Sequence, residues 1–408
     1  MTSDEVAIPQ DFPTTPSEWG WGALDSLCEG IYDCAHSTPE LTAEGPYLIR
    51  TQNFPDGSLR FSDMARVSRE THLDRTRRAT PRHGDVIYSR EGSYHGIAAE
   101  IPDGVEACMG QRMVLIRPNV KALDFRFLRY WLNSNFVRSF IAGAKEGSGA
   151  PRINLPTIRR MAVPLPSLRE QRAVGALLGA LDDKIAVNER IAATAEDLML
   201  TIASTVRWDR RIQLGEICSL RKEQCSPQEL GVDIVDHYSL PAFDAKKVAD
   251  RVSPASIKSN KFVIPGDAVL LSKLNPEIPR VWDAQPDQKI LALASTEFLV
   301  LTPKSGLSTH QLWAVVAQQD FRSVLASRVT GTSKSHQRVR PAEALATEVV
   351  DPRQFGEEGQ QIEGLAEKTA LARKENRTLA ALRDTLLPQL MSGRLRIRDT
   401  EKIVEDHA

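Results

Sequence analysis

Residues 164–191 read Pro164-Leu-Pro-Ser-Leu-Arg-Glu-Gln-Arg-Ala-Val-Gly-Ala-Leu-Leu-Gly-Ala-Leu-Asp-Asp-Lys-Ile-Ala-Val-Asn-Glu-Arg-Ile191. Ser167 and Glu170 have the Ser-x-x-Glu spacing of a capping box, in which each side chain satisfies a backbone N–H at a helix start. The seam that follows steps alternately by four and three residues, through Val174, Leu178, Leu181, Ile185, Asn188, Ala192, Ala195, Met199 and Ile202. This 3.5-residue period predicts a long helix with a narrow coiled-coil seam.

A second stretch with the same spacing lies far downstream. It runs through Ile362, Leu365, Thr369, Ala372, Asn376, Leu379, Arg383 and Leu386. We expect the two helices to pair, although each could instead pack its apolar stripe on its own domain. Asn188 and Asn376 occupy seam positions, where a polar residue lowers stability but fixes register. In antiparallel pairing the two would face one another; the alternative is two unrelated Asn residues at a solvent edge.

The two halves of the chain share a series of features about 190 residues apart. Gly84–Arg90 and Gly266–Lys273 each read as a turn followed by a strand that delivers a cation into the next loop. Other matching features are leading elements at 21–30 and 211–220, strands around 111–117 and 297–302, helices around 125–144 and 309–328, and basic loops at 147–153 and 331–339. A period of this length predicts a domain-plus-helix unit used twice.

Charge is distributed unevenly in a chain whose net charge is only −1. Residues 1–49 contain no Lys or Arg and nine Asp or Glu, whereas residues 50–165 contain 19 Lys or Arg against 11 Asp or Glu. Residues 251–341 contain 12 against 6. Two basic blocks in matching positions indicate an anionic partner such as nucleic acid. The sequence has no run of 18 apolar residues and no basic leader followed by an apolar segment, so we expect a cytoplasmic protein.

Motifs for catalysis are missing from the sequence. There is no Gly-x-x-x-x-Gly-Lys phosphate loop, no His-Glu-x-x-His and no pair of Cys-x-x-Cys clusters. An autonomous adenine methyltransferase would carry an Asn/Asp-Pro-Pro-Tyr/Phe tetrad, and the nearest stretch, Asn275-Pro-Glu-Ile278, lacks the second Pro and the aromatic residue that would hold a flipped base. We therefore expect a protein that is not an enzyme, binds no metal and reads DNA.

A DNA reader needs cations for phosphates and forked or amide side chains for base edges. In the first half the candidates are Arg50, Gln52, Asn53, Arg90, Tyr94, His95, Gln111, Arg112 and Arg152, with a denser basic patch at Arg75, Arg77 and Arg78 assigned to phosphate. In the second half they are Tyr238, Lys273, Asn275, Arg280, Lys334, Ser335, His336, Gln337 and Arg338. For any one of them a solvated or structural role is the alternative, but together they cluster in loops after strands and helices.

These residues resemble a known family, the specificity subunits of type I restriction-modification systems. The segment 163–172, with Ala180-Leu-Asp-Asp-Lys-Ile185 and Asn188 after it, looks like the family's central conserved region. Residues 375–393 are similar to its distal conserved region, and His237-Tyr-Ser-Leu-Pro-Ala-Phe-Asp244 looks like part of one type of its target recognition domain. The resemblance spans residues 21 to about 396.

The resemblance implies an α+β protein in which two mixed α/β target recognition domains are separated by two long antiparallel coiled-coil helices, with an internal pseudo-twofold repeat. The expected ranges are an acidic N-terminal extension (1–18), target recognition domain 1 (19–165), the central helix (166–206), target recognition domain 2 (207–355), the distal helix (356–392) and a C-terminal tail (393–408). The implied partners are double-stranded DNA, two copies of a methylation (M) subunit, and motor-nuclease (R) subunits. S-adenosylmethionine, ATP and magnesium are expected on those partners, and no cofactor on this chain.

The two helices are expected to act as a ruler between two DNA half-sites. Rods of about 37 and 30 residues would be roughly 55 and 45 Å long, which corresponds to roughly 13 to 16 base pairs between domain centres. Charged residues on the outer helix faces, among them Arg169, Asp182, Asp183 and Arg190, indicate further protein contacts. The competing interpretation is a stand-alone DNA-binding regulator, which would be stable and bind DNA tightly when purified without partners.

Overall fold

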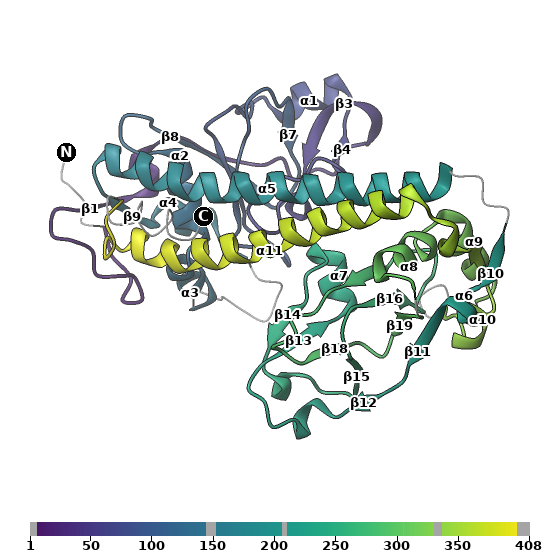
Figure 1. The fold of residues 1–408 in the computed structure, drawn as a ribbon. Coiled ribbons are helices and arrows are strands. Elements are labelled where there is room, and N and C mark those ends of the chain that lie inside the picture. The colour runs from purple at the N-terminus through teal and green to yellow at the C-terminus, as the bar shows by residue number, and fades with distance from the viewer. Residues whose placement is uncertain (1–5, 144–151, 206–209, 305, 330–336, 398–408) are drawn as a thin grey trace. The chain divides into compact units, whose positions relative to one another are not determined.

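The computed structural model describes residues 6–143, 152–205, 210–304, 306–329 and 337–397 (Figure 1). The chain divides into two compact units, the first made of Met1–Lys184 with Thr378–Ala408 and the second of Ile185–Arg377. Each unit takes in portions of both long helices, α5 (Leu168–Thr205) and α11 (Glu357–Met391). The domain ranges expected from the sequence therefore remain predictions.

The first unit contains a four-stranded antiparallel sheet of order β2-β8-β5-β6 and a three-stranded sheet of order β4-β3-β7, in which β3 and β7 are parallel. A third pairing joins β1 to β9. Up to α5, the elements are β1 (Gly20–Ala23), η1 (Leu24–Leu27), β2 (Cys28–Asp33), β3 (Thr42–Ile49), η2 (Thr51–Asn53), β4 (Ala65–Arg66), α1 (Arg69–Arg75), β5 (Val86–Ser89), β6 (Ala98–Glu100), β7 (Ala107–Met109), β8 (Met113–Pro118), α2 (Phe125–Asn133), α3 (Asn135–Gly143), α4 (Leu155–Arg159) and β9 (Ala162–Leu165).

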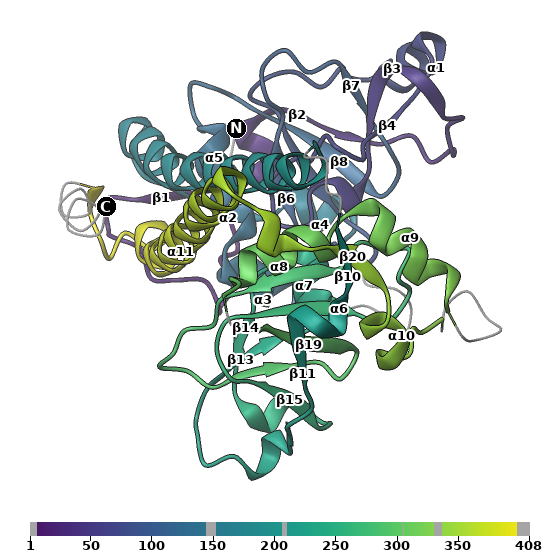
Figure 2. The same cartoon turned by 45° about the vertical axis from the view of Figure 1, so that its right-hand side comes forward.

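The second unit contains a four-stranded antiparallel sheet of order β11-β19-β16-β17 and a five-stranded sheet of order β12-β15-β18-β13-β14. Figure 2 shows β11 and β19 side by side. Between the long helices, the elements are β10 (Arg211–Gln213), α6 (Leu214–Ile217), β11 (Cys218–Arg221), β12 (Gln224–Cys225), η3 (Pro227–Glu229), β13 (Val235–Tyr238), α7 (Leu240–Lys246), β14 (Asp250–Val252), η4 (Pro254–Ser256), β15 (Lys261–Ile264), β16 (Ala268–Ser272), β17 (Val281–Ala284), β18 (Ala292–Ala294), β19 (Phe298–Pro303), α8 (Thr309–Val316), α9 (Gln319–Ser327), α10 (Pro341–Leu345), β20 (Glu348–Val350) and η6 (Pro352–Gln354).

The two units repeat one topology. In each, a short leading strand pairs with the strand that precedes a long helix, as β1 with β9 and β10 with β20. In each, a parallel pair occurs in the second sheet, β3 with β7 and β13 with β18. The central strand β5 aligns Ser89 with Met113, and β16 aligns Ser272 with Phe298. The internal repeat predicted from the sequence is confirmed.

Strands β5 and β16 lie at the centre of their sheets and are buried along their whole length. This explains why both read as continuous apolar runs, because a strand covered on both faces needs no polar alternation. Each ends in a buried serine, Ser89 at 0% exposure and Ser272 at 3%, immediately before the predicted cation. The sheets therefore fix where the following loops begin.

Helix α5 begins with the predicted capping box. Ser167 N donates to Glu170 Oε2 (3.1 Å), and Glu170 N donates to Ser167 Oγ (3.3 Å). The seam residues from Val174 to Met199 are all buried, including Asn188 at 2% exposure. In α11 the buried residues include Ile362, Thr369, Ala372, Leu379 and Leu386. Both predicted helices therefore form, and the seam of α5 is buried from Val174 to Met199, whereas Leu365, Asn376 and Arg383 of the α11 seam are partly buried.

Within the second unit the two helices pair antiparallel. Asn188 Nδ2 donates to Asn376 Oδ1 (2.9 Å), and Asn376 Nδ2 donates to the carbonyl of Ile185 (3.2 Å). Farther along α5, Glu196 forms an ion pair with Arg373, so a later residue of α5 meets an earlier residue of α11. The predicted contact between Asn188 and Asn376 is confirmed, as is the α+β class with long antiparallel helices.

Two predicted helices are each divided into two. The helix expected over 125–144 consists of α2 and α3, because Ser134 is extended (φ −67°, ψ 155°) and its Oγ accepts the N–H of Val137. The helix expected over 309–328 consists of α8 and α9, separated where Gln318 is extended (φ −62°, ψ 144°). At the first break the Ser134 hydroxyl takes part in a backbone hydrogen bond, and near the second Gln318 donates to the carbonyls of Leu200 (3.1 Å) and Ala314 (2.8 Å). The apolar periodicity reveals neither.

The N-terminal extension, whose role the sequence leaves undefined, packs onto the first unit. Phe12 is buried, with its ring centroid 5.1 Å from that of Trp131 and 5.6 Å from that of Phe140. Arg396 donates to Glu170 (3.0 Å) and also pairs with Glu18. Gly393 has φ +69°, and a Cβ there would lie 2.6 Å from Pro16 Cδ. Arg396 thus links the extension to the start of α5.

None of the helices in the described ranges is long and apolar enough to cross a membrane.

Candidate nucleic-acid interface

Three backbone hydrogen bonds bring the predicted loops of the first unit together. Arg90 N donates to the carbonyl of Arg112 (2.9 Å), and Ile153 N donates to the carbonyl of Arg90 (2.8 Å). Gly110 N donates to the carbonyl of Ile49 (2.7 Å). We call the resulting group loop cluster 1, made of residues 50–53, 90–96, 110–112 and 152–153.

The second unit assembles its loops in the same way. Lys273 N donates to the carbonyl of Glu297 (3.0 Å), and Val339 N donates to the carbonyl of Lys273 (3.0 Å). Ser295 N donates to the carbonyl of Tyr238 (2.9 Å). We call this group loop cluster 2, made of residues 238–239, 273–280, 295–297 and 337–339.

The two clusters share one backbone frame. By these hydrogen bonds and the strand registers, Arg90 corresponds to Lys273 and Arg112 corresponds to Glu297. Isolated β-bridges join Glu91 to Arg152 and Leu274 to Arg338, which makes those two arginines correspond as well. The frame therefore presents different side chains at equivalent points.

Both clusters contain residues with unusual backbone conformations. Among the described residues three non-glycine residues have positive φ, and two of them, Arg112 (φ 68°) and Asn275 (φ 47°), lie in the loop clusters. Gly92, which corresponds to Asn275, has φ +85°. Such conformations cost free energy outside glycine and concentrate at functional sites.

Most of the predicted DNA-contacting residues that the structure describes are accessible. Gln52, Arg77, Arg78, Tyr94, Arg112, Arg152 and Arg338 are exposed, and Arg50, His95, Gln111, Lys273, Asn275, Arg280 and Gln337 are partly buried. Arg77 and Arg78 follow α1 and lie outside the two clusters as defined here. Lys334, Ser335 and His336 lie outside the described residues. The DNA-binding role of the accessible residues remains a prediction.

Two predicted base readers are buried in structural roles. Asn53 is 3% exposed, and its Oδ1 accepts the N–H of Arg50 (2.8 Å), which closes the turn after β3. Tyr238 is 5% exposed, with its ring centroid 4.7 Å from that of Trp282. Burial raises the pKa of the Tyr238 hydroxyl. These positions support the loops, which corrects the prediction that they contact DNA.

Two predicted cations are also internal. Arg75 is 9% exposed and donates to the carbonyls of Met109 (3.0 Å), Ser37 (3.0 Å) and Ala35 (3.2 Å). Arg90 is 4% exposed and donates to Asp33 (2.8 Å). A buried guanidinium requires such partners, because an unpaired buried charge is costly. Both therefore hold loops in place, and their predicted assignment to DNA is corrected.

Sequence reasoning missed the carboxylates that pair with the loop arginines. Arg152 Nε lies 3.2 Å from Glu91, and Arg338 donates to Glu297 through two hydrogen bonds of 3.0 Å. Arg280 donates to Asp244 through two hydrogen bonds of 2.7 Å. Hydrogen bonding to Glu297 raises the pKa of Arg338. Glu91 and Glu297 lie among several acidic residues of the two basic blocks and Asp244 lies outside them, so the sequence did not single these carboxylates out.

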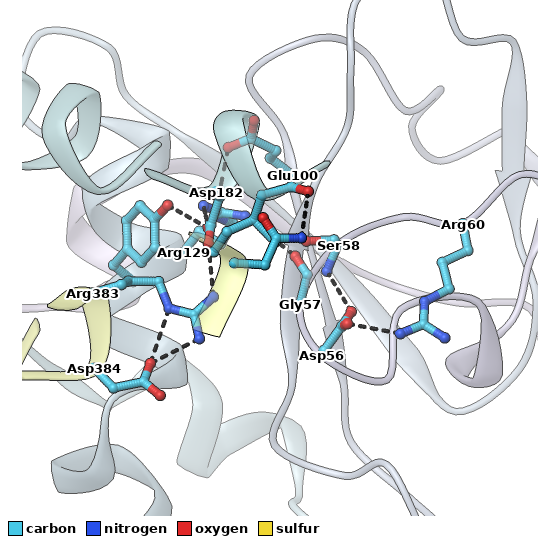
Figure 3. A network of polar contacts seen from close by, with 12 residues as sticks. Asp56, Gly57, Ser58, Arg60, Glu100, Arg129, Asp182, Arg383 and Asp384 are labelled. Atoms are coloured by element: carbon cyan, nitrogen blue, oxygen red, sulfur yellow. Dashed lines mark hydrogen bonds and ion pairs between the residues drawn. The ribbon is translucent and has the colours of Figure 1, made fainter. Parts of the chain in front are cut away.

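A further polar network in the first unit surrounds Asp182 of α5 (Figure 3). Asp182 accepts hydrogen bonds from Arg129 (2.9 Å), Tyr130 (2.6 Å) and Arg383 (2.8 Å). Burial alone would raise the pKa of Asp182, but Arg129, Tyr130 and Arg383 hold it below its usual value. The network lines a cavity of about 440 Å³. Asp182 was expected on an outer docking face, and the structure places it in this internal network instead.

The first unit contains most of a segment that matches a known family. Residues 58–197 match the family model of the type I restriction modification DNA specificity domain. The resemblance to specificity subunits is confirmed. The chain is also similar to the EcoBI specificity subunit of a type I restriction enzyme from Escherichia coli, with 22% identity over 170 residues. That alignment covers 42% of this chain and 35% of the relative, so the match spans about a third of the relative's length.

Its fold is similar to that of the type I restriction-modification S subunit from M. genitalium. The TM-score is 0.55 at 17% sequence identity, and the alignment covers 91% of this chain and 96% of that one. At this level of identity the likeness concerns the fold alone.

Proposed function

We propose that this chain is the DNA sequence-specificity subunit of a type I restriction-modification complex. In this proposal each loop cluster reads one half of an asymmetric, bipartite site in double-stranded DNA. The chain would not itself be an enzyme. It would dock two copies of a methylation subunit, and motor-nuclease subunits would join that core. S-adenosylmethionine, ATP and magnesium would be bound by those partners.

The observation that carries the proposal is the backbone frame shared by the two loop clusters. Two sites that share a backbone arrangement but carry different side chains suit two ligands of the same chemical class whose recognised groups differ. Arg112 in one cluster corresponds to Glu297 in the other, and Glu91 corresponds to Leu274. Two half-sites of different base sequence are such a pair of ligands, because the duplex backbone is common to both and the base edges differ.

Charge supports the same proposal. The basic excess of the chain lies in the segments 50–165 and 251–341, which contain loop cluster 1 and all of loop cluster 2 except residues 238–239. Cations outside the clusters, such as Arg77 and Arg78, would contact phosphates, and such contacts set orientation without reading sequence. The affinity for DNA should therefore fall as the salt concentration rises, while the preference for particular bases remains.

The long helices would set the spacing between the half-sites. Helix α5 is 38 residues long and α11 is 35 residues long. At about 1.5 Å per residue they are roughly 57 and 52 Å long, which is the length of roughly 15 to 17 base pairs of duplex. The unread spacer would follow from these lengths.

Sequencing of methylated bases tests the proposal. The host genome is compared with and without this chain, with the methylation subunit present in both. We expect a bipartite methylated motif that disappears when the chain is removed. Replacing loop cluster 1 by that of a relative should change one half of the motif only. An unchanged methylation pattern after removal of the chain would overturn the proposal, and tight sequence-specific binding without any methylation would favour a stand-alone regulator.

A further inference from the structure

One arginine position recurs in the two loop clusters with a carboxylate beside it. In loop cluster 1, Arg152 Nε lies 3.2 Å from Glu91 Oε1. The arginine side chain is 63% exposed and the glutamate side chain 27%. The guanidinium is therefore accessible to solvent, and the carboxylate beside it is less exposed.

In loop cluster 2 the corresponding arginine is Arg338. Its Nε and Nη2 donate to the two carboxylate oxygens of Glu297, both at 3.0 Å. The arginine side chain is 44% exposed and the glutamate 26%. A bidentate pair of this kind fixes the plane of the guanidinium as well as its position.

The two carboxylates come from different loops. Glu91 follows β5, and its counterpart in the second unit is Leu274. Glu297 precedes β19, and its counterpart in the first unit is Arg112. One exposed ion pair on a protein surface carries little information. Here the corresponding arginines of both clusters, Arg152 and Arg338, each have a carboxylate beside them, although the two glutamates come from positions that do not correspond. This indicates that an arginine at this position requires a carboxylate.

The carboxylate decides between the two ligands that DNA offers to an arginine. A phosphate beside this pair would be repelled by the carboxylate, because like charges within a few ångströms disfavour one another. A base edge carries no net charge, and the commonest specific contact of arginine is the bidentate one with O6 and N7 of guanine. That contact requires an oriented planar fork. Glu297 fixes the plane of the Arg338 fork through two hydrogen bonds, and Glu91 contacts Arg152 at Nε, which leaves the terminal nitrogens of that guanidinium for a base.

We propose that Arg152 and Arg338 each read a guanine, one in each half-site, and that Glu91 and Glu297 are the positioning residues that orient them. This inference rests on the proposed function. It makes Glu91 and Glu297 determinants of specificity that lower general affinity for DNA, because each removes positive charge from the surface that faces the duplex.

The experiment is selection of duplexes from a randomised library by the full chain assembled with its methylation subunits. Glu297→Gln should reduce the preference for guanine at one position of one half-site by about tenfold, a loss within the range of one bidentate contact. Glu91→Gln should do the same in the other half-site. Affinity for random duplex should rise in both variants, whereas general damage to the loops would lower it.

Charge-matched controls separate orientation from net charge. Glu106→Gln removes the partner of Arg69 in the first unit, and Glu343→Gln removes a carboxylate near Arg328 in the second. These variants should keep the wild-type motif. Arg338→Lys keeps the cation without the fork, and it should lose the guanine preference while retaining affinity for random duplex.

Two results would overturn the inference alone: Glu91→Gln and Glu297→Gln that select the wild-type motif unchanged, or Arg338→Lys that keeps the guanine preference. Either would leave a bipartite motif for the wild type, so the proposed function would stand. A wild-type assembly that selects no motif would overturn the proposed function together with the inference.

Discussion

Asp182 shows how a residue's surroundings determine its role. It accepts hydrogen bonds from residues of α2 and α11 that lie 53 and 201 positions away in the sequence. On α5 alone it would be one more charge on a helix face. Its partner Arg129 is 6% exposed, so the carboxylate compensates a charge that has left water.

We therefore expect Asp182→Asn to destabilise the protein. Removing one partner of a buried ion pair costs about 3 kcal/mol or more. The pKa of Asp182 is lowered in the folded state, so its contribution is complete above the unfolded value of about 4 and is lost as the pH falls below it. Urea unfolding of wild type and variant should give a large difference at pH 7 that shrinks below about pH 4.

The neighbouring residue provides the control. Asp183 is exposed, and Asp183→Asn should change the free energy of unfolding by less than about 0.5 kcal/mol. A difference for Asp182→Asn that stays constant down to pH 3 would mean that the lost contribution is not the ionised carboxylate.

The residues of the loop clusters show which assignments a sequence can support. Residue type and position after a strand or helix predicted that Arg112, Arg152 and Arg338 lie in exposed loops, and they do. The same criteria included Asn53 and Arg90, which are buried. Their partners, Arg50 and Asp33, are fixed by loop closure in three dimensions. No local sequence pattern distinguishes the exposed loop residues from the buried ones.

At the scale of elements, the heptad spacing predicted both long helices, because a seam with a 3.5-residue period is a local property of the sequence. The breaks at Ser134 and Gln318 could not be predicted in the same way, since they depend on where the following helix must pack. The pairing of Asn188 with Asn376 could be predicted because, in two antiparallel helices, the residue numbers of any two facing residues add up to nearly the same value.

The contact between Asn188 and Asn376 leads to a prediction about stability: single Leu variants should lower the free energy of unfolding, whereas the double variant should not. Asn188→Leu or Asn376→Leu alone breaks the hydrogen bond between the two amides and places an apolar side chain beside the remaining amide. The remaining amide keeps one other hydrogen bond, Asn188 to Glu375 (2.6 Å) or Asn376 to the carbonyl of Ile185 (3.2 Å), so each single variant should lower the free energy of unfolding by about 1 kcal/mol. The double variant removes both amides and should be more stable than either single variant, and at least as stable as wild type. Urea unfolding of the four proteins measures this cycle.

The register role has its own readout. If the Asn pair selects one register, the double variant should methylate sites with a mixture of spacer lengths. A double variant that is less stable than both single variants, or that keeps one spacer length, would contradict the assigned role.

The N-terminal extension leads to a further prediction. Phe12 is buried against Trp131 and Phe140, and Phe12→Ala should lower the free energy of unfolding by about 3 kcal/mol, as for other buried aromatic residues. Ile8→Ala is the matched control, because Ile8 is 47% exposed and its loss should cost less than about 0.5 kcal/mol. Equal effects of the two variants would show that the extension does not contribute to the first unit's stability.

At the scale of the molecule, the repeat was visible in the sequence because each copy keeps the same order of turn, strand, loop and helix. Sheet order was not, since strand pairing joins residues such as Ser89 and Met113 through contacts that no local pattern encodes. The repeat explains how one chain could read an asymmetric site. The copies keep the backbone frame and differ in the charges placed on it.

The last prediction concerns the spacer between half-sites. Duplicating residues 185–191 of α5 and the heptad 370–376 of α11 lengthens both helices by about 10 Å, or about three base pairs of duplex, while each half keeps its seam. Methylation sequencing should find both half-sites unchanged and the spacer longer by about three base pairs. Duplication in α5 alone would leave the helices unequal in length, and we expect it to abolish methylation. An unchanged spacer in the double duplication would show that something other than helix length sets the distance.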